Sequence, residues 1–299
     1  MVRSAVLGVS MFEEFTLERV ELPDATLRVR HGGSGPPVLL LHGHPRTHTT
    51  WYRVAPLLAE HHTVVCPDLR GYGQSSKPAD TDDHGGMAKR ALADDMVALM
   101  AHLGHRRFAV VGHDRGSYVA FRLAMDHPEQ VSHLAFLGLV PIGEALERAN
   151  ERFARLWWHW FFFGQPKKPE RAILADPDAW YGNSPEKRVQ MGAENYADYY
   201  AAVHDPATVH AMLEDYRAGL GIDREHDAAD REAGRSLRCP TLVLWPLFDD
   251  EEELYADILS IWRPWAADLR GHGLRSGHHL AEEVPEELAA ALLGFLNGG

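Results

Sequence analysis

The stretch of residues 108–120 constrains the fold more than any other part of the chain. A short apolar run at 108–111 is typical of a buried strand, and a helical pattern follows at 117–128. Between them lies Gly112-His113-Asp114-Arg115-Gly116. In a tight strand-to-helix turn, side chains two positions before and after the central residue would collide with neighbouring backbone, which favours glycine there. The pattern therefore predicts a sharp turn that presents Asp114 at its tip.

A carboxylate at the tip of such a turn has two interpretations. It can attack a carbon atom directly and form an ester with it, as nucleophilic side chains in enzymes do. It can also be an ordinary acidic residue that stabilises the N-terminus of the following helix. The flanking glycines favour the nucleophile, because a helix start alone does not need them.

Strands and helices alternate along most of the chain. Apolar runs predict buried strands at 38–41, 63–66, 108–111, 131–140 and 241–245, a weaker strand at 268–272, and an antiparallel edge hairpin at 15–22 and 25–31. Helical spacing predicts helices at 51–60, 88–103, 117–128, 250–259 and 285–296. This alternation is typical of an α/β fold with a mostly parallel sheet.

The alternation stops between residues 142 and 236, where the sequence is helical, aromatic and charged and offers no strand. Helices inserted after one strand of a parallel sheet lie over the carboxyl edge, where such sheets bind ligands. We therefore expect an N-terminal tail at 1–14, an α/β core at 15–141 and 237–299, and a helical lid at 142–236.

Composition excludes several classes of function. The 299-residue chain carries a formal net charge of −13, which disfavours nucleic acid and anionic membranes as partners. It has two cysteines, a number that suits a reducing cytoplasm, and no apolar run of membrane-spanning length. We therefore expect a cytoplasmic protein with a small-molecule substrate; a homodimer is left open.

His278 is the candidate base, because it lies after the last predicted strand and before the last helix, in Ser276-Gly277-His278-His279. A neutral imidazole there could activate the water that hydrolyses an ester on Asp114. The adjacent His279 is the competing assignment. An acid that orients the histidine is expected just beyond the strand at 241–245, where Asp249 and Asp250 stand. The same pair also suits the start of a helix, so one aspartate can serve each purpose.

Further residues could bind substrate near Asp114. The backbone N–H groups of Arg115 and His44 would form an oxyanion site if the loop His42-Gly43-His44-Pro45 lies beside the turn, and the Arg115 guanidinium could hold a carboxylate. The aromatic run at 156–163 reads mainly as a helix packed on the core. His159 and Trp160 within it, with Tyr216, could donate hydrogen bonds to a small anion. His42, His44 and His48 lack the spacing of a metal site, and we expect no metal or cofactor.

The chain resembles the α/β-hydrolase fold enzymes of the haloalkane dehalogenase and epoxide hydrolase group, and within it the fluoroacetate (haloacetate) dehalogenases. The motifs that carry the resemblance are His42-Gly-His-Pro45, Asp68-Leu-Arg-Gly-Tyr-Gly-Gln-Ser75, Gly112-His-Asp-Arg-Gly116, Trp158-His-Trp160, Asp215-Tyr-Arg-Ala-Gly219 and Gly277-His278. The resemblance implies an eight-stranded, mostly parallel sheet with a helical lid after the strand that follows the turn.

The resemblance also implies roles for residues. Asp114 would be the nucleophile and His278 the base, Arg115 would bind the substrate carboxylate, and His159, Trp160 and Tyr216 would hold the departing halide. The expected reaction is hydrolytic removal of halide from a small haloacid such as fluoroacetate or chloroacetate, through a covalent aspartyl ester.

Two positions depart from the haloacetate pattern. Tyr118 stands where that branch has a second arginine for the carboxylate. Gly138 stands where the branch has its triad acid, and Asp249 matches the position that the wider group uses instead. These departures affect the expected substrate more than the expected mechanism.

Two other functions stay open. An epoxide hydrolase would use the same Asp114 and His278, with Tyr216 and a second lid tyrosine protonating the epoxide oxygen; the candidates for the second are Tyr181, Tyr196, Tyr199 and Tyr200. A ligand-binding protein on a hydrolase fold is the other, since a fold does not fix a function.

Overall fold

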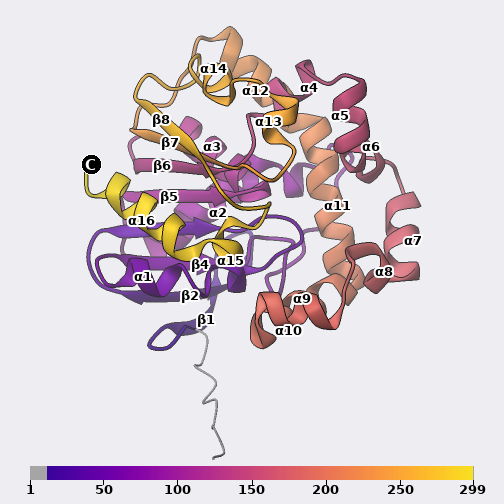
Figure 1. Cartoon of the computed structure of the whole chain (residues 1–299), viewed down its shortest axis with the longest axis horizontal. Helices are drawn as coiled ribbons and strands as arrows, with labels where there is room; N and C mark the ends of the chain where they lie inside the picture. The colour runs from indigo at the N-terminus through magenta and orange to yellow at the C-terminus, as the bar shows by residue number, and fades with distance from the viewer. Residues whose placement is uncertain (1–11, 299) are drawn as a thin grey trace, which may run out of the picture.

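The computed structural model describes residues 12–298, so most of the predicted N-terminal tail lies outside the described residues. One eight-stranded sheet forms the centre of the molecule (Figure 1). Its strands are β1 (Thr16–Glu21), β2 (Thr26–Gly33), β3 (Pro37–Leu41), β4 (Thr63–Pro67), β5 (Phe108–His113), β6 (Val131–Leu137), β7 (Thr241–Pro246) and β8 (Leu269–Leu274).

The strand order is β1-β2-β4-β3-β5-β6-β7-β8. β1 and β2 form the antiparallel edge hairpin, β2 also pairs antiparallel with β4, and the pairs from β4 to β8 are parallel. The predicted α/β fold with a mostly parallel sheet is confirmed. β5 lies near the middle of the sheet, so the turn that follows it opens at the centre of the carboxyl edge.

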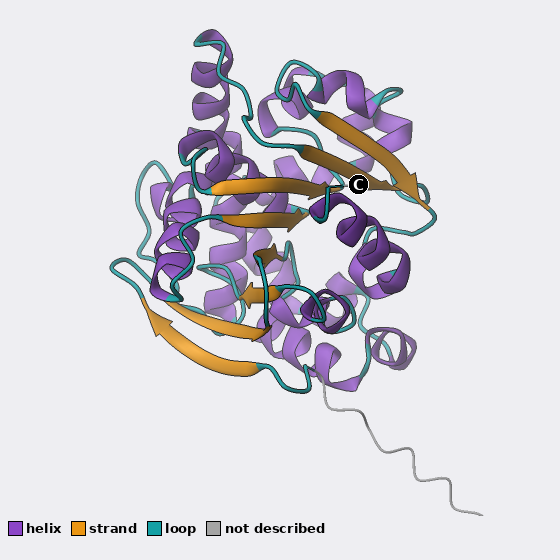
Figure 2. Ribbon diagram, turned by 90° about the vertical axis from the view of Figure 1, so that its left-hand side faces the viewer, coloured by secondary structure: helices purple, strands orange, loops and turns teal. Residues whose placement is uncertain are grey.

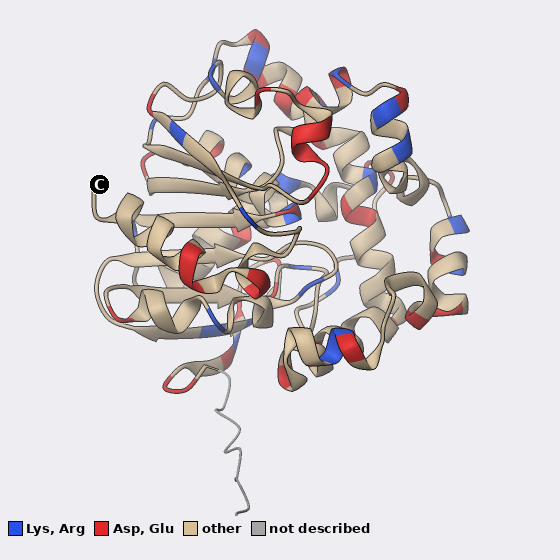
Figure 3. Cartoon of the chain, in the orientation of Figure 1, with Lys and Arg blue, Asp and Glu red and all other residues tan. Residues whose placement is uncertain are grey.

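Alternate side chains of the central strands enter two apolar cores, one on each face of the sheet. Leu39 and Val110 belong to the core under α2 and α3, whereas Leu40 and Val111 belong to the core under α1 and α16. The strands read as continuous apolar runs because both faces are covered by helices (Figure 2). Charged residues accordingly lie on helices, loops and the outer strands β1, β2 and β8, whereas β3 to β7 carry none (Figure 3).

The helices of this α/β core flank the sheet. They are the 3₁₀ helices η1 (His48–Trp51) and η2 (Gly85–Met87) and the α-helices α1 (Ala55–Ala59), α2 (Lys89–His102), α3 (Arg115–Asp126), α13 (Glu251–Leu254), α14 (Ile258–Trp262), α15 (Leu280–Glu283) and α16 (Pro285–Leu296). None of the described helices is both long and apolar enough to cross a membrane.

The segment between β6 and β7 is helical, and we call it the helical insertion. It contains α4 (Ile142–Glu147), α5 (Glu151–Leu156), α6 (Trp158–Phe163), α7 (Lys168–Ala175), α8 (Pro177–Tyr181), α9 (Pro185–Met191), α10 (Ala193–His204), α11 (Pro206–Leu220) and α12 (Ile222–Glu232). It covers the carboxyl ends of the strands, and α11 runs along the boundary with the core (Figure 1).

Most predicted elements differ from the structure by one or two residues at an end, and three differ by more. The helix expected at 51–60 is divided into η1 and the short α1, because Pro56 in the first turn of α1 has no N–H to donate to a preceding turn. The helix expected at 250–259 is broken into α13 and α14, since Tyr255 is extended and Asp257 caps a new start. The strand expected at 131–140 ends at Leu137, because Gly138 and Leu139 both have positive φ.

Candidate active site

Asp114 lies at the tip of the turn between β5 and α3, with φ 51° and ψ −124°. A Cβ atom on Gly112 would come 2.4 Å from the Gly116 oxygen, and one on Gly116 would come 2.4 Å from the His42 oxygen. Both flanking glycines are therefore required sterically, as the sequence predicted. Strain of this kind persists where the surroundings hold it, and it is concentrated at functional sites.

Backbone donors surround the carboxylate of Asp114. The His44 N–H donates to Oδ1 at 2.6 Å, and the Arg115 backbone N–H bonds to the same carboxylate. A Cβ on Gly43 would lie 2.3 Å from Oδ1, so only glycine allows this approach. Burial opposes ionisation, but the charges of His278 and His113 and the Arg115 N–H outweigh it and lower the pKa of Asp114. Asp114 is an ionised, oriented carboxylate.

His278 faces the other carboxylate oxygen. Its Nδ1 donates to Asp249 Oδ2 at 2.7 Å, and its Nε2 lies 3.9 Å from Asp114 Oδ2. His113 Nε2 donates to the His278 carbonyl at 2.8 Å and so fixes the loop. Burial disfavours the imidazolium, but the Asp249 hydrogen bond and the Asp114 charge outweigh it and raise the pKa of His278 to about 9.

The structure distinguishes Asp249 from Asp250 as the candidate acid, and His278 from His279 as the candidate base. Asp249 contacts the histidine, whereas Asp250 precedes α13 and makes no side-chain bond to its first turn. His278 lines a cavity together with Asp114, whereas His279 lines a different hollow. The residues that the sequence proposed as nucleophile, base and acid therefore lie together.

A cavity of about 220 Å³ lies between the turn and the helical insertion. One wall is apolar, from Leu139, Leu156 and Trp157. The remaining lining residues are His44, Asp114, His159, Trp160, Tyr216, Asp249, Asp250 and His278. This volume accommodates a small organic molecule and brings donors of the insertion opposite Asp114.

The donors that line the cavity are neutral. Burial lowers the pKa of His159 to about 4 and that of His44 to about 3, so both rings are uncharged at neutral pH. Burial and the nearby Asp114 charge raise the pKa of Tyr216 well above its usual value. Together with the Trp160 indole, His159 and Tyr216 can therefore donate hydrogen bonds to an anion without being ionised.

Arg115 and Tyr118 do not line this cavity. Arg115 Nε donates to Asp215 Oδ1 at 2.8 Å and Nη2 to the Asp215 carbonyl at 2.9 Å, and the guanidinium lies 4.2 Å from the centre of the Tyr216 ring. Asp215 also accepts bonds from Lys89 and Tyr72. Sequence reasoning missed this partner, because 100 residues separate Arg115 from Asp215.

Tyr118 is buried behind Arg115. Its ring lies 5.1 Å from the Arg115 guanidinium, and its hydroxyl has no hydrogen-bond partner among the described residues. Burial raises its pKa well above the usual value, so the phenol stays protonated. Tyr118 can therefore affect substrate binding only through its contact with Arg115, or directly after its neighbours rearrange.

The histidines weighed as a metal site have separate partners. His42 Nε2 accepts a bond from the Leu69 N–H at 3.0 Å, and His48 Nδ1 contacts Asp68 at 2.7 Å. His44 faces the aromatic rings of the insertion instead, with the Tyr216 ring centre at 5.4 Å. The three rings do not converge on one point within residues 12–298.

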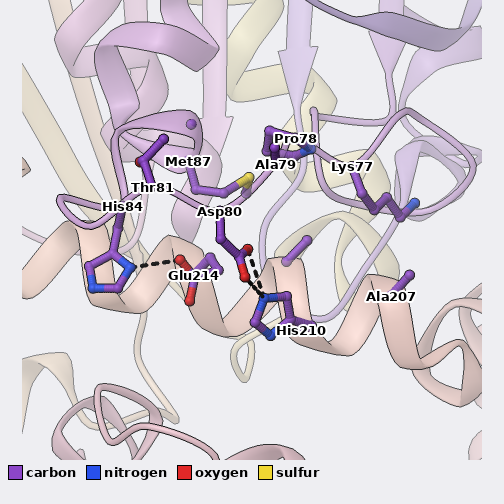
Figure 4. Close-up of a pocket in the computed structure, with 12 residues that line it drawn as sticks. Lys77, Pro78, Ala79, Asp80, Thr81, His84, Met87, Ala207, His210 and Glu214 are labelled. Carbon is purple, nitrogen blue, oxygen red and sulfur yellow. Dashed lines mark hydrogen bonds and ion pairs between the residues drawn. The ribbon is translucent and has the colours of Figure 1, made fainter.

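A second hollow lies where the loop before η2 meets α11 (Figure 4). His84 Nδ1 contacts Glu214 at 2.6 Å, and His210 Nε2 contacts Asp80 at 2.9 Å. These two pairs join the loop of the core to α11 of the insertion, which indicates an attachment between the two parts.

Comparison with known proteins agrees with this geometry. Residues 36–246 match the family described as alpha/beta hydrolase fold. A fluoroacetate dehalogenase from Burkholderia sp is 41% identical, covering 96% of this chain and 95% of the relative. A soluble epoxide hydrolase from Corynebacterium sp. (strain C12) is 32% identical, covering 88% and 91%.

A solved structure from Nostoc sp PCC 7120, provisionally described as an alpha/beta hydrolase, superposes with a TM-score of 0.92 at 41% identity, covering 97% of this chain and 100% of that one. The sequence resemblance and the α/β fold agree with these matches. The chain belongs to the alpha/beta hydrolase fold family, and within it to the group that contains the dehalogenases and epoxide hydrolases.

Proposed function

We propose that the protein is a hydrolytic dehalogenase that removes halide from a small haloacid, such as fluoroacetate or chloroacetate, through an ester on Asp114. The observation that carries the proposal is the cavity, in which His159, Trp160 and Tyr216 lie together with Asp114 and His278. Neutral donors opposite a carboxylate nucleophile suit a leaving group that becomes an anion. The name of the Burkholderia relative supports the same substrate class.

In the first step, Asp114 Oδ2 attacks the carbon that bears the halogen. The new C–O bond forms as the C–X bond breaks, and the electron pair leaves with the halide. His159, Trp160 and Tyr216 stabilise that halide as its charge develops, which lowers the barrier because the interaction is strongest in the transition state. The helical insertion acts as a lid that keeps bulk water from competing.

In the second step, water attacks the ester carbonyl carbon of Asp114. His278 Nε2 takes a proton from the water, and the charge on Oδ1 is held by the backbone N–H groups of His44 and Arg115. Collapse of the tetrahedral intermediate releases the alcohol oxygen, which takes the proton back from His278. The regenerated Asp114 loses its proton to solvent.

The order of these steps supports the use of His278 as a base. In the resting site, Asp114 and Asp249 raise the pKa of the histidine to about 9, so it is protonated at neutral pH. Ester formation removes the Asp114 charge and with it one cause of the high pKa. The histidine therefore becomes a better base only after the ester exists.

The substrate carboxylate needs a positive partner. Arg115 directly follows Asp114 in the chain, and its Nη1 is the part of the guanidinium that Asp215 does not hold. Neither Arg115 nor Tyr118 lines the cavity, so we propose that the Arg115 guanidinium binds the carboxylate after its neighbours rearrange, with weaker binding than two arginines would give.

The epoxide hydrolase reading is less well supported. It needs two tyrosine hydroxyls across the cavity from Asp114, and Tyr216 alone among the candidate tyrosines lines it. Tyr199 donates to Asn183 at 2.8 Å and lies against Lys187 instead. A purely ligand-binding role also lacks support, since Asp249 is within hydrogen-bond reach of His278.

Release of fluoride, chloride and bromide from the corresponding haloacetates tests the proposal, with Asp114→Asn as the blank. We expect release by the wild type and none by the variant. If wild type releases no halide from any of the three, the haloacid assignment fails, and an epoxide or an uncharged haloalkane becomes the next substrate to test.

A further inference from the structure

Glu251 is a buried acid that the mechanism above does not use. It is the first residue of α13, its side chain is 1% exposed, and neither carboxyl oxygen reaches a hydrogen-bond partner on another described residue. An unpartnered buried carboxyl group costs free energy, because it gives up water without replacement. Its presence beside the catalytic residues therefore calls for a function.

The carboxyl group of Glu251 lies close to the base and its acid. One oxygen of Glu251, one of Asp249 and one ring nitrogen of His278 all lie within 4.8 Å of each other. Gly138, the residue after β6, has no side chain and so leaves space for this carboxyl group. A Cβ built on Gly138 would come 3.0 Å from Glu251 Oε1, so a larger residue there would displace the acid.

We propose that Glu251 is a second positioning acid for His278, sharing with Asp249 the task of holding the histidine while it takes a proton from water. The role rests on the proposed ester mechanism, in which His278 acts in the second step. Asp249 supplies the direct hydrogen bond, and Glu251 supplies a second negative charge at short range when it ionises. The glycine at 138 and the acid at 251 act as a pair, since one makes room for the other.

Several charged groups act on these two residues. Those around His278 are Asp249, Asp250, Asp114, Glu251, His113, His159 and His279. Those around Glu251 are Asp249, His278, Asp250 and Tyr255. Burial and then the Asp249 charge raise the pKa of Glu251 to about 8, against the opposing charge of His278. The two groups therefore titrate in neighbouring pH ranges, and the charge of each one changes the pKa of the other.

The first test needs no substrate. The pKa of His278 is measured by NMR in ¹³C-histidine-labelled wild type and Glu251→Gln, and the resonance is assigned from its loss in His278→Asn. Glutamine has the same shape but cannot ionise, so we expect the pKa of His278 to fall by about half a pH unit or more. An unchanged pKa overturns the proposal.

Glu253→Gln is the matched control. Glu253 lies on the same helix, but it is half-exposed and lies 3.7 Å from Arg152. We expect this variant to leave the pKa of His278 at its wild-type value. If the pKa of His278 falls equally in Glu251→Gln and Glu253→Gln, the effect comes from the overall charge of α13, and the proposal is overturned.

The second test separates the two steps of turnover. In rapid-mixing experiments with bromoacetate, Glu251→Gln should give a normal burst of halide and then hydrolyse the ester about tenfold more slowly. The same change added to Asp249→Asn should slow hydrolysis further. If the double variant matches Asp249→Asn alone, Glu251 does not support the histidine. If wild type releases no halide, the dehalogenase proposal fails while the NMR result still decides the role of Glu251.

Thermal unfolding at several pH values tests whether Glu251 acts through its ionisation or only through packing. Because the folded pKa of Glu251 lies above that of an unfolded glutamate, the group destabilises the folded state increasingly as pH rises from about 4.5 to 8. Glu251→Gln should therefore gain in melting temperature relative to wild type over that range. A variant that is less stable at every pH, with an unchanged His278 pKa, would identify Glu251 as a packing residue only.

Discussion

At the scale of single residues, the site is a set of charges that depend on one another. Asp114 stays ionised despite its burial because His278 and backbone N–H groups favour its charge, and His278 holds a proton because Asp114 and Asp249 favour the imidazolium. Each step of the proposed reaction changes one of these charges. The site is therefore prepared for ester formation at rest and for ester hydrolysis afterwards.

This coupling predicts the effect of removing the Asp114 charge. Asp114→Asn imitates the ester, which is also neutral, so the pKa of His278 should fall from about 9 toward its ordinary value. NMR titration of the labelled histidine measures the shift. A pKa that stays at the wild-type value would mean that Asp114 does not control the protonation of the base.

Gly43 gives a steric test of the same carboxylate. In Gly43→Ala the new methyl group would lie 2.3 Å from Asp114 Oδ1, displacing either the nucleophile or the His44 N–H. We expect turnover to fall by about a hundredfold or more, as loss of an oxyanion donor does elsewhere. Gly294→Ala on α16, where a Cβ meets nothing within 4 Å, should leave turnover unchanged. Equal activity in both variants would contradict this account.

Sequence reasoning selected Asp114 and the Asp249–Asp250 pair because each follows a clearly apolar strand, and it selected His278 because that residue lies between a weaker strand and the last helix. It predicted neither the contact of Asp215 with Arg115 nor the burial of Glu251. Both depend on contacts between distant segments, and no local pattern encodes them.

At the scale of elements, buried strands were the most predictable parts of the chain. β3, β4, β5 and β7 read as short apolar runs because both faces of the sheet are covered, and α16 was predicted with its observed bounds. The short helices near the site were the least predictable. The predicted helix at 250–259 is broken where Tyr255 is extended and the Asp257 side chain caps a new helix start.

The attachment of α11 to the core predicts a pH dependence. Burial lowers the pKa of His210, but its bonds to Asp80 and Glu170 outweigh this and raise it. Its stabilising contribution is therefore complete below the unfolded pKa of about 6.5 and is lost as pH rises through the folded value. We expect His210→Gln to melt earlier than wild type at pH 5.5 and equally at pH 9.

Scanning calorimetry at the two pH values measures this difference. His272→Gln, at an exposed position on β8, is the control and should match wild type at both. A deficit in His210→Gln that is as large at pH 9 as at pH 5.5 would show that the ring acts by packing, not by its charge.

At the scale of the whole molecule, the helical insertion and the α/β core share one apolar cluster. Phe153 and Tyr216 of the insertion belong to the same cluster as Leu41 and Val110 of the sheet. Buried ion pairs join the two parts as well, since Lys89 of α2 contacts Asp215 of α11. We therefore expect the chain to unfold in one cooperative transition.

Arg122 tests this linkage. On α3, it contacts Asp230 at 2.6 Å and Asp227 at 3.1 Å, both on α12, and it is 3% exposed. Arg122→Met leaves the buried Asp227 without its ion-pair partner, while Asp230 keeps Arg235, and should lower the free energy of unfolding by roughly 3–5 kcal/mol. Arg155→Met, at an exposed pair with Glu253, should change it by less than about 1 kcal/mol. Chemical denaturation measures both, and equal effects would contradict the assignment.

The covalent ester on Asp114 is the central claim, and intact-protein mass spectrometry of His278→Ala tests it most directly. After exposure to bromoacetate, the variant should gain the mass of one carboxymethyl group, located by peptide mapping on Asp114, while Asp114→Asn gains none. If His278→Ala stays unmodified while the wild type releases halide, or if it turns over at a near-normal rate, the ester mechanism with His278 as its base is wrong.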